Sequence, residues 1–332
     1  MKIKTSCFAL TQALFWIACF AGSGYAQVVT PSLDPTAPIV LPAAAGWKQM
    51  STIGVSSFER TGSRDFNGSS VYEFQGTGYS GHFNFMMGEK LAVDAYAYGD
   101  SMTISKDTYL NGRVNLETNE ARLSLTLSHE EFTIFGLGVQ TITTKDHILE
   151  LGLDSDETTT LNKTIPSLSL KIGDYFYLGG GMERIKESSS FMVGNSWANL
   201  VAGVALQMGS PESSMFRFEY SQSNSPKSVS SAKGGKKESV HLAETISRIN
   251  AELKVKGLVL SISIKDRKRK VNLIHPVTGD KVEVDQTINS QLGVLLVPQE
   301  GAILGFIFHT DTRKELFEDK VEGFEIKLSY AF

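Results

Sequence analysis

The sequence offers few side chains whose types and spacing could carry out catalysis. Among its six histidines, the best local groupings with acids are His309 with Asp311, and His147 with Asp154 and Asp156. A hydrolytic site needs a nucleophile or an activated water within hydrogen-bond reach of a base. Neither grouping places such a pair on one face of a strand, where alternate residues meet. We therefore expect ordinary rim and loop histidines and predict that the protein is not an enzyme.

Metal and cofactor sites have equally little support. Asp154, Asp156 and Glu157 could offer oxygen ligands to calcium, but their spacing does not complete an EF-hand loop. The stretch 234–237, Gly-Gly-Lys-Lys, lacks the spacing of a phosphate-binding loop. We interpret both as solvated loops and predict no metal and no cofactor.

Residues 1–26 have the features of a secretory signal peptide. A start with two lysines is followed by an apolar core at residues 8–20, and Gly24-Tyr25-Ala26 provides small side chains before a cut after Ala26. The apolar core is too short for a membrane-spanning helix. An uncleaved anchor and a lipoprotein cut before Cys19 are the alternatives.

Removal of this segment would leave a mildly acidic chain without cysteine. Cys7, Cys19 and two lysines lie within it, so the formal net charge goes from −4 to −6. Such a chain forms no disulfide and no thiolate metal site. Its acidity also gives no reason to expect a nucleic-acid partner, which usually needs a basic face.

Residues 27–48 form a separate proline-rich segment, with Pro31, Pro35, Pro38 and Pro42 alternating with small and apolar residues. Proline breaks both helices and hydrogen-bonded ladders, so an extended leader is expected. A disordered tail is the simplest interpretation. A tether in the periplasm and a plug inside a barrel are the other two.

From residue 49 to residue 332 the hydrophobic pattern has a period of two, which predicts strands. No apolar run long enough for a helical membrane span follows residue 26. The pattern is clearest where Phe324, Ile326, Leu328, Tyr330 and Phe332 alternate with Glu325, Lys327, Ser329 and Ala331, and where Ile249, Ala251, Leu253 and Val255 alternate with polar residues.

Short and long connections alternate along this region. The short ones lie at 128–130, 173–174, 209–211, 256–257 and 298–300, and the long ones at 145–164, 185–196, 222–240 and 267–284. This rhythm is typical of transmembrane barrels with short periplasmic turns and longer outer loops. The sequence therefore predicts an all-β fold, a transmembrane antiparallel up-and-down barrel of 14 to 16 strands. The count of 16 includes separate strands near 102–109 and 113–118.

The last strand resembles the assembly signal of Gram-negative outer-membrane β-barrel proteins. That family ends in an aromatic residue preceded by alternating apolar residues, as Ile326, Leu328, Tyr330 and Phe332 do here. The resemblance is to porin-like barrels and identifies no subfamily. It implies a cell outer-membrane location and recognition by the barrel-insertion machinery. The mature chain lacks the Asn-Pro-Ala start expected of a long-chain fatty-acid transporter.

If the apolar set faces lipid, the opposite set faces the lumen and includes Arg122, Arg217, Glu219, Arg248, Asn250, Glu252 and Lys254. Charges of both signs facing inward need water or partners. A water-filled channel whose wall charges set its solute preference is one interpretation. A salt-bridged, closed interior is the other.

Two basic clusters fall in the expected outer loops, at Lys236 and Lys237 and at Arg267, Lys268, Arg269 and Lys270. They could pair with the phosphates of lipopolysaccharide, and an ordinary solvated loop is the alternative.

The sequence thus favours a passive channel for small solutes in contact with outer-membrane lipid. A transporter of hydrophobic substrates and a non-conducting structural or adhesive barrel are the alternatives.

Overall fold

A computed structural model gives the architecture of the chain. It describes residues 27–48, 50–66, 69–87, 91–106, 113–129, 132–150, 153–173, 175–190, 195–210, 213–233, 236–274, 281–298, 301–314 and 318–332. The expected signal peptide, residues 1–26, lies outside this part.

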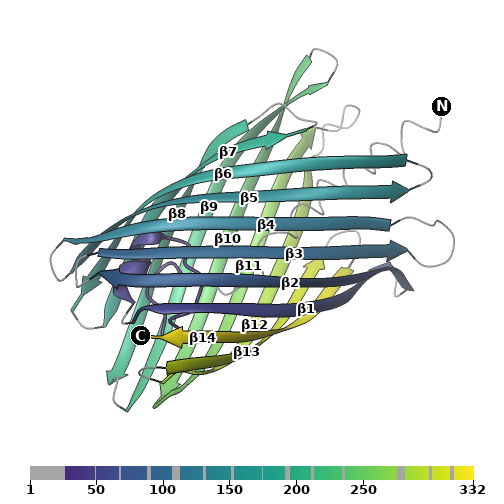
Figure 1. The fold of residues 1–332 in the computed structure, drawn as a ribbon. Helices are drawn as coiled ribbons and strands as arrows, with labels where there is room; N and C mark the ends of the chain where they lie inside the picture. The colour runs from purple at the N-terminus through teal and green to yellow at the C-terminus, as the bar shows by residue number, and fades with distance from the viewer. Residues whose placement is uncertain are drawn as a thin grey trace.

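Fourteen antiparallel strands close into a barrel in which each strand pairs with its neighbours in sequence and β1 pairs with β14. Figure 1 shows the long strands inclined side by side around the wall. The strands are β1 (Thr52–Phe66), β2 (Ser69–Met87), β3 (Leu91–Lys106), β4 (Arg113–His129), β5 (Thr133–Glu150), β6 (Leu153–Ile172), β7 (Phe176–Ser189), β8 (Asn195–Ser210), β9 (Ser214–Lys233), β10 (Lys236–Val255), β11 (Leu258–Ile274), β12 (Lys281–Leu296), β13 (Gly301–Lys314) and β14 (Glu318–Ala331). The predicted all-β barrel is confirmed.

The strand number is the lower end of the predicted range, and the count of 16 was wrong. Residues 102–106 are the end of β3, and residues 113–118 are the start of β4. These two segments were predicted as separate strands because the alternation of apolar residues stops part-way along β3 and β4. The strands themselves continue past that point.

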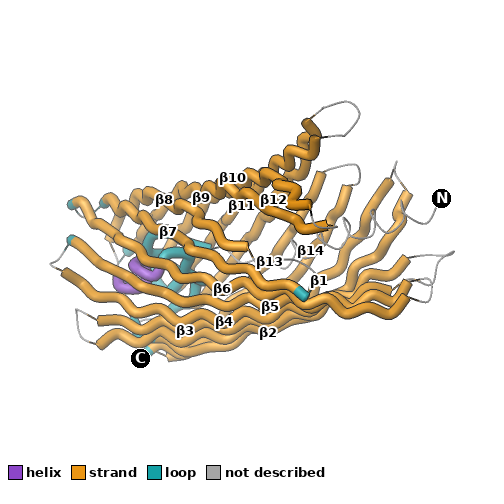
Figure 2. Tube along the Cα trace, turned by 90° about the horizontal axis from the view of Figure 1, so that it is seen from above, coloured by secondary structure: helices purple, strands orange, loops and turns teal. Residues whose placement is uncertain are grey.

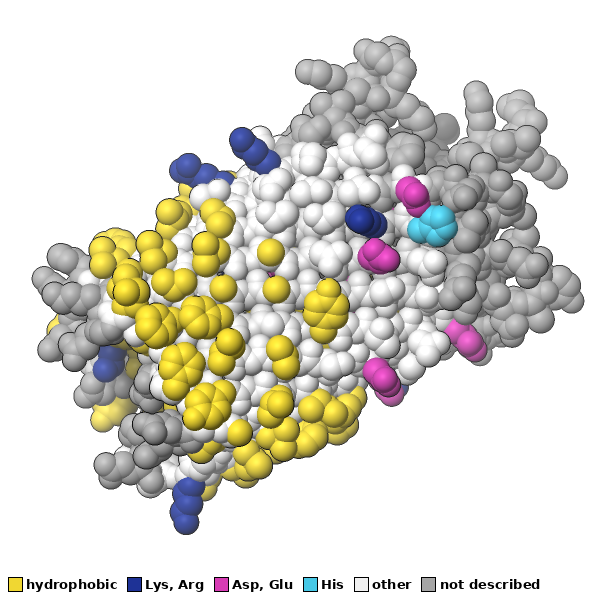
Figure 3. Space-filling view, in the orientation of Figure 1, with side chains coloured by type: hydrophobic (Ala, Val, Ile, Leu, Met, Phe, Trp, Pro, Cys, Tyr) yellow, Lys and Arg dark blue, Asp and Glu magenta, His cyan; other side chains and the backbone are white. Residues whose placement is uncertain are grey.

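Large apolar side chains on the outer face form a belt around one end of the barrel. Leu123, Leu125 and Leu127 of β4 and Phe135 and Leu137 of β5 are all about half exposed. Figure 3 shows these hydrophobic side chains gathered toward one end, while the opposite end carries polar and charged ones. We call the end that carries the belt and the C-terminus the C-terminal rim, and the opposite end the far rim. Side chains of the belt that face outward suit hydrocarbon, since lipid covers them without cost.

Beyond the belt, the barrel wall extends where long loops were expected. Residues 145–164 belong to β5 and β6, and residues 222–240 belong to β9 and β10, except for short connections. The stretch 267–284 likewise includes the end of β11 and the start of β12. A strand of about 9–11 residues crosses the hydrocarbon, so strands of up to 20 residues rise well past the belt. There the outer face meets water and no longer needs apolar residues, which is why the pattern gave no strand signal.

The proline-rich segment lies inside the barrel. Figure 2 shows its loops and its 3₁₀ helix η1 (Pro42–Trp47) enclosed by strands near the C-terminal rim. The expectation of a disordered tail was wrong, because wall side chains bind the segment at many points. We call residues 27–48 the plug. Within the described part of the chain, no helix has the length and apolar character needed to cross a bilayer.

Candidate functional site

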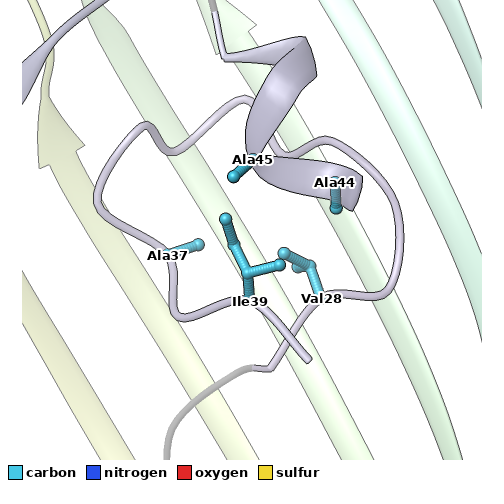
Figure 4. Close-up of a cluster of buried hydrophobic side chains, with 5 residues drawn as sticks. All are labelled: Val28, Ala37, Ile39, Ala44 and Ala45. Carbon is cyan, nitrogen blue, oxygen red and sulfur yellow. The ribbon is translucent and has the colours of Figure 1, made fainter. Parts of the chain in front are cut away.

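The plug folds back on itself around a small apolar cluster. Val28 and Ile39 form a parallel bridge, in which the Val28 amide donates to the Pro38 carbonyl at 3.0 Å and the Val40 amide donates to the Val28 carbonyl at 2.7 Å. Figure 4 shows the side chains of Val28 and Ile39 grouped with three alanines of the plug, Ala37, Ala44 and Ala45. The segment is therefore ordered despite its prolines. Only a few of its backbone amides need partners within the plug.

Glycines in the wall let the plug approach the strands closely. A Cβ added at Gly136 of β5 would lie 2.2 Å from the amide nitrogen of Ala43, and one at Gly203 of β8 would lie 2.9 Å from a methyl carbon of Val29. Such distances are far below ordinary contact. Glycine at position 136 lets the Ala43 backbone rest against β5, and glycine at position 203 leaves room for the Val29 side chain.

Apolar side chains join the plug to the same side of the wall. Val29, Val40 and Leu41 of the plug are buried against Ile165 of β6 and Val201 of β8. The helix η1 packs against β3, β4, β5 and β6.

A buried charge network holds the first residues of the plug. The Glu219 carboxylate accepts from the amides of Val29 at 3.1 Å and Thr30 at 2.9 Å, and also from the Thr30 hydroxyl. The Arg217 guanidinium pairs with Glu219 and donates to the Thr30 hydroxyl at 2.6 Å. Arg217 and Glu219 are both 0 % exposed, so their charges depend on each other and on the plug.

Glu252 on β10 extends this network along the plug. Its carboxylate accepts from the Leu33 amide at 2.8 Å and from the Ser32 hydroxyl, and it pairs with Arg217 at 3.2 Å. The Asn250 side-chain amide donates to Glu219 at 3.1 Å. Four of the predicted lumen residues therefore converge on one short stretch of the plug.

A second group of charges binds the other end of the plug. Arg122 of β4 donates to the carbonyl of Ile39 and lies 3.6 Å from the Asp94 carboxylate. Lys48 forms an ion pair with the same carboxylate at 3.2 Å. The Trp47 indole donates to the Ser169 hydroxyl at 2.8 Å.

The last two predicted lumen residues make no described contact with the plug. Arg248 is buried in the field of Glu183, Glu219 and Glu244, and Lys254 is half-buried near the C-terminal rim. Of the seven predicted positions, six are thus buried on the inner side of the wall. That they line a conducting pore stays a prediction.

The opposite side of the plug faces a small cavity of about 20 Å³, which is room for roughly one water molecule. Asp34, Ala37 and Pro38 of the plug line it together with Ser263 of β11 and Lys327 of β14. We call this space the side cavity. The Asp34 carboxylate lies 3.8 Å from the Lys327 ammonium across it.

The C-terminal strand places its predicted assembly residues on the outer face. Ile326, Leu328, Tyr330 and Phe332 are all about half exposed within the belt. The Phe332 amide donates to the Ser51 carbonyl at 3.1 Å, which fixes the chain end against the start of β1. Their recognition by insertion machinery stays a prediction.

The basic residues expected in outer loops lie on strands instead. Lys236 and Lys237 begin β10, and the stretch 267–270 belongs to β11. Arg267 pairs with Glu244, and Lys268 lies 3.3 Å from Asp266. Acidic neighbours therefore balance part of this charge, and binding to lipopolysaccharide stays a prediction.

The two histidine groupings remain separate from the plug. His147 contacts Asp156 at 2.6 Å on the exposed outer part of β5 and β6, and His309 contacts Glu325 at 3.2 Å on the inner wall. Within the described residues, no group of three or more histidine, cysteine, aspartate or glutamate side chains could hold a metal ion.

The plug contacts themselves had no signal in the sequence. Glu219 was expected in the lumen, but its partners Val29 and Thr30 lie about 190 positions away. The proline-rich composition of residues 27–48 raised a plug as one alternative. Inward glycines such as Gly203, which leave room for it, are a further signal that could have favoured that alternative.

The fold resembles that of solved transport barrels. A Pseudomonas aeruginosa FadL homologue has a TM-score of 0.55 at 10% identity, over 88% of this chain and 93% of that chain. The P. putida toluene transporter TodX has a TM-score of 0.55 at 10% identity, over 89% and 93%. The Ralstonia pickettii toluene transporter TbuX has a TM-score of 0.55 at 10% identity, over 94% and 96%.

No protein-family model matches the sequence, and no curated protein matches it. At such low identity the likeness shows a shared fold. The three similar structures are barrels of about the same extent as this chain, and two of them are described as transporters. The closed wall of fourteen strands, its apolar belt and this shared fold make the chain an outer-membrane β-barrel.

Proposed function

We propose that the protein carries small hydrophobic solutes across the outer membrane and that residues 27–48 close its lumen at rest. The observation that carries this proposal is the plug itself. It lies inside the barrel at the level of the apolar belt, where Arg217, Glu219 and Glu252 bind its backbone.

This arrangement favours the hydrophobic-substrate alternative over a permanently open channel. A barrel of fourteen strands is wide enough for an aqueous lumen unless something fills it. Here five of the wall charges, Asp94, Arg122, Arg217, Glu219 and Glu252, are engaged with the plug or with one another. A charge already paired in a buried site adds little to the selection of a passing ion.

The interior also contains a buried aromatic cluster. Phe58 of β1 stacks on Tyr98 of β3 with ring centroids 5.5 Å apart, and Tyr96 joins them in a buried cluster. On their strands these residues lie farther from the C-terminal rim than the plug contacts of Asp94. Aromatic faces suit hydrocarbon solutes. Two of the structures with a similar fold are described as toluene transporters, which supports the same solute class.

The experiment compares the complete protein with a variant that lacks residues 27–47. In planar bilayers the complete barrel is expected to show little steady conductance, and the deletion is expected to raise it at least tenfold. In intact cells the complete protein is expected to increase uptake of radiolabelled toluene while leaving sucrose uptake unchanged. An empty vector is the control. Steady conductance of the complete barrel together with sucrose uptake would instead support the passive channel.

A further inference from the structure

The plug is attached unevenly around the lumen. Toward β4 to β8 it meets glycines at distances that exclude any side chain, buries Leu41, and packs η1 against the strands. Toward β9 and β10 it is bound by carboxylates, through Glu219 and Glu252. These two sides hold the plug by shape and by charge.

The wall formed by β11, β12 and β13 holds the plug differently. Between this wall and the plug lies the side cavity, lined by small and neutral side chains of the wall that include Ser261, Ser263 and Gln291. Leu33 packs partly against an apolar cluster of Val259 and Leu295 near the rim.

One side chain that lines the side cavity has a hydrogen-bond acceptor without a partner. Asn250 is 2 % exposed and uses its amide nitrogen on Glu219. Its carbonyl oxygen has no hydrogen-bond partner among the described atoms, and the residue is one of those that line the side cavity. A buried acceptor without a partner is costly. This space is therefore better suited to a solute that enters and leaves than to permanent packing.

The part of the plug that borders the side cavity is a self-contained turn. The Asp34 carboxylate accepts from the Thr36 amide at 2.8 Å and the Thr36 hydroxyl at 2.6 Å, and the Ala37 amide donates to the Asp34 carbonyl at 3.2 Å. The turn keeps these bonds if it moves as a unit. Its described ion pair with the wall joins Asp34 to Lys327 at 3.8 Å.

We propose that the transported solute passes the plug through the side cavity, between residues 34–38 and the wall of β11 to β13, when the Asp34–Lys327 ion pair opens. This inference rests on the proposed function. At rest the space of about 20 Å³ is too small for an aromatic ring, since a cavity that binds benzene measures about 150 Å³. The turn at residues 34–37 must therefore move away from this wall, while the glycine-packed side of the plug stays in place.

Reversible cross-links test this route, since residues 27–332 contain no cysteine. In the double variant D34C and K327C, a short bifunctional methanethiosulfonate ties the turn to β14. Linkage is expected to lower toluene uptake by intact cells at least tenfold, and reduction is expected to restore it.

The matched control ties the opposite side of the plug. The Ala43 amide donates to the Ser167 hydroxyl at 2.9 Å, so the double variant A43C and S167C can form a disulfide there. Oxidation of this pair is expected to leave uptake within twofold of the reduced protein. If both links stop uptake, the whole plug must leave, and the inference is overturned. If neither link stops it, the solute passes elsewhere, and the inference is equally overturned.

A labelling experiment tests the route without measuring transport. A cysteine at S263C borders the side cavity, and one at S169C lies under Trp47 on the attached side. Methyl methanethiosulfonate is expected to modify S263C at least tenfold faster. Equal rates overturn the inference. If toluene uptake equals that of the empty vector, the proposed function fails, and these rates alone decide whether the side cavity opens.

Discussion

At the scale of the residue, the side chain of Glu219 has two roles. Its carboxylate neutralises Arg217, and it accepts hydrogen bonds from two successive amides of the plug. Those amides lie just before Pro31, which has no amide hydrogen to donate. A buried carboxylate is thus the acceptor that replaces a strand partner. The cost of burying it is offset by the guanidinium and by charge-assisted hydrogen bonds.

Substituting Glu219→Gln removes the charge while keeping the shape. We expect a loss of on the order of 2 to 3 kcal/mol in the free energy of unfolding, because Arg217 loses a partner and the bonds to the plug weaken. Urea unfolding in detergent measures this loss. Glu322→Gln is the control, since Glu322 is exposed and pairs with Lys320 at the surface, where such pairs contribute about 0–1 kcal/mol. Equal losses in the two variants would contradict the role of Glu219.

The wall glycines give a second prediction at this scale. Gly136→Leu is expected to displace the plug, since even its Cβ would lie 2.2 Å from the Ala43 amide nitrogen. Bilayer conductance should therefore rise toward that of the plug deletion. Gly180→Leu is the matched control, because a Cβ at Gly180 meets nothing within 4 Å. Conductance that does not differ between the two variants would show that the plug tolerates the added side chain.

At the scale of the element, the outer face of a strand is apolar within the belt and polar beyond it. On β4 the outward residues Leu123, Leu125 and Leu127 belong to the belt, while Glu117 and Asn119 lie farther along the same face. Along the described part of β4, inward-facing buried residues alternate regularly with outward-facing ones. A strand that leaves the membrane therefore keeps its hydrogen-bond ladder and changes only its outer side chains.

A charge placed on the outer face of β4 tests the height of the belt. Leu125→Arg is expected to destabilise the barrel in lipid vesicles by about 2–4 kcal/mol, the cost of such a charge near the midplane. Asn119→Arg, on the same face of the same strand, is expected to change stability by less than about 1 kcal/mol. Unfolding titrations in vesicles provide both values. A small loss for Leu125→Arg would place Leu125 outside the hydrocarbon.

The sequence predicted the strands well only where one face meets lipid. Leu123 to Leu127 and Phe324 to Phe332 were recognised because apolar and polar residues alternate there. Residues 222–240 were assigned to a loop, because both faces are polar outside the membrane. The plug could not be predicted in detail for another reason. Its stability comes from wall residues such as Glu219 and Gly136, which no local pattern links to residues 27–48.

The barrel depends on its last strand at the scale of the whole molecule. β14 pairs with β13 on one side and with β1 on the other, from Thr52 opposite Ala331 to Asp65 opposite Glu318. The outward side chains of this strand are the ones that resemble an assembly signal. We predict that insertion machinery recognises them before lipid covers the strand.

Deleting Phe332 tests whether that end is recognised in cells. We expect at least a fivefold slower appearance of the folded, heat-modifiable form in cells, because the terminal aromatic residue is part of the proposed signal. Refolding of the purified variant in detergent should proceed at the rate of the complete protein. A variant that is equally slow in detergent would indicate a structural role for Phe332, whose amide binds Ser51.

The pairing of β1 with β14 also dictates an order of events during folding. A ring of fourteen strands cannot close before its final residues have left the ribosome, so insertion follows synthesis. The plug lies inside that ring and is bound by β4, β9 and β10, which are synthesised after it. Its first residues therefore wait for partners about 190 positions later in the chain, and they reach their final place only once those strands have joined the sheet.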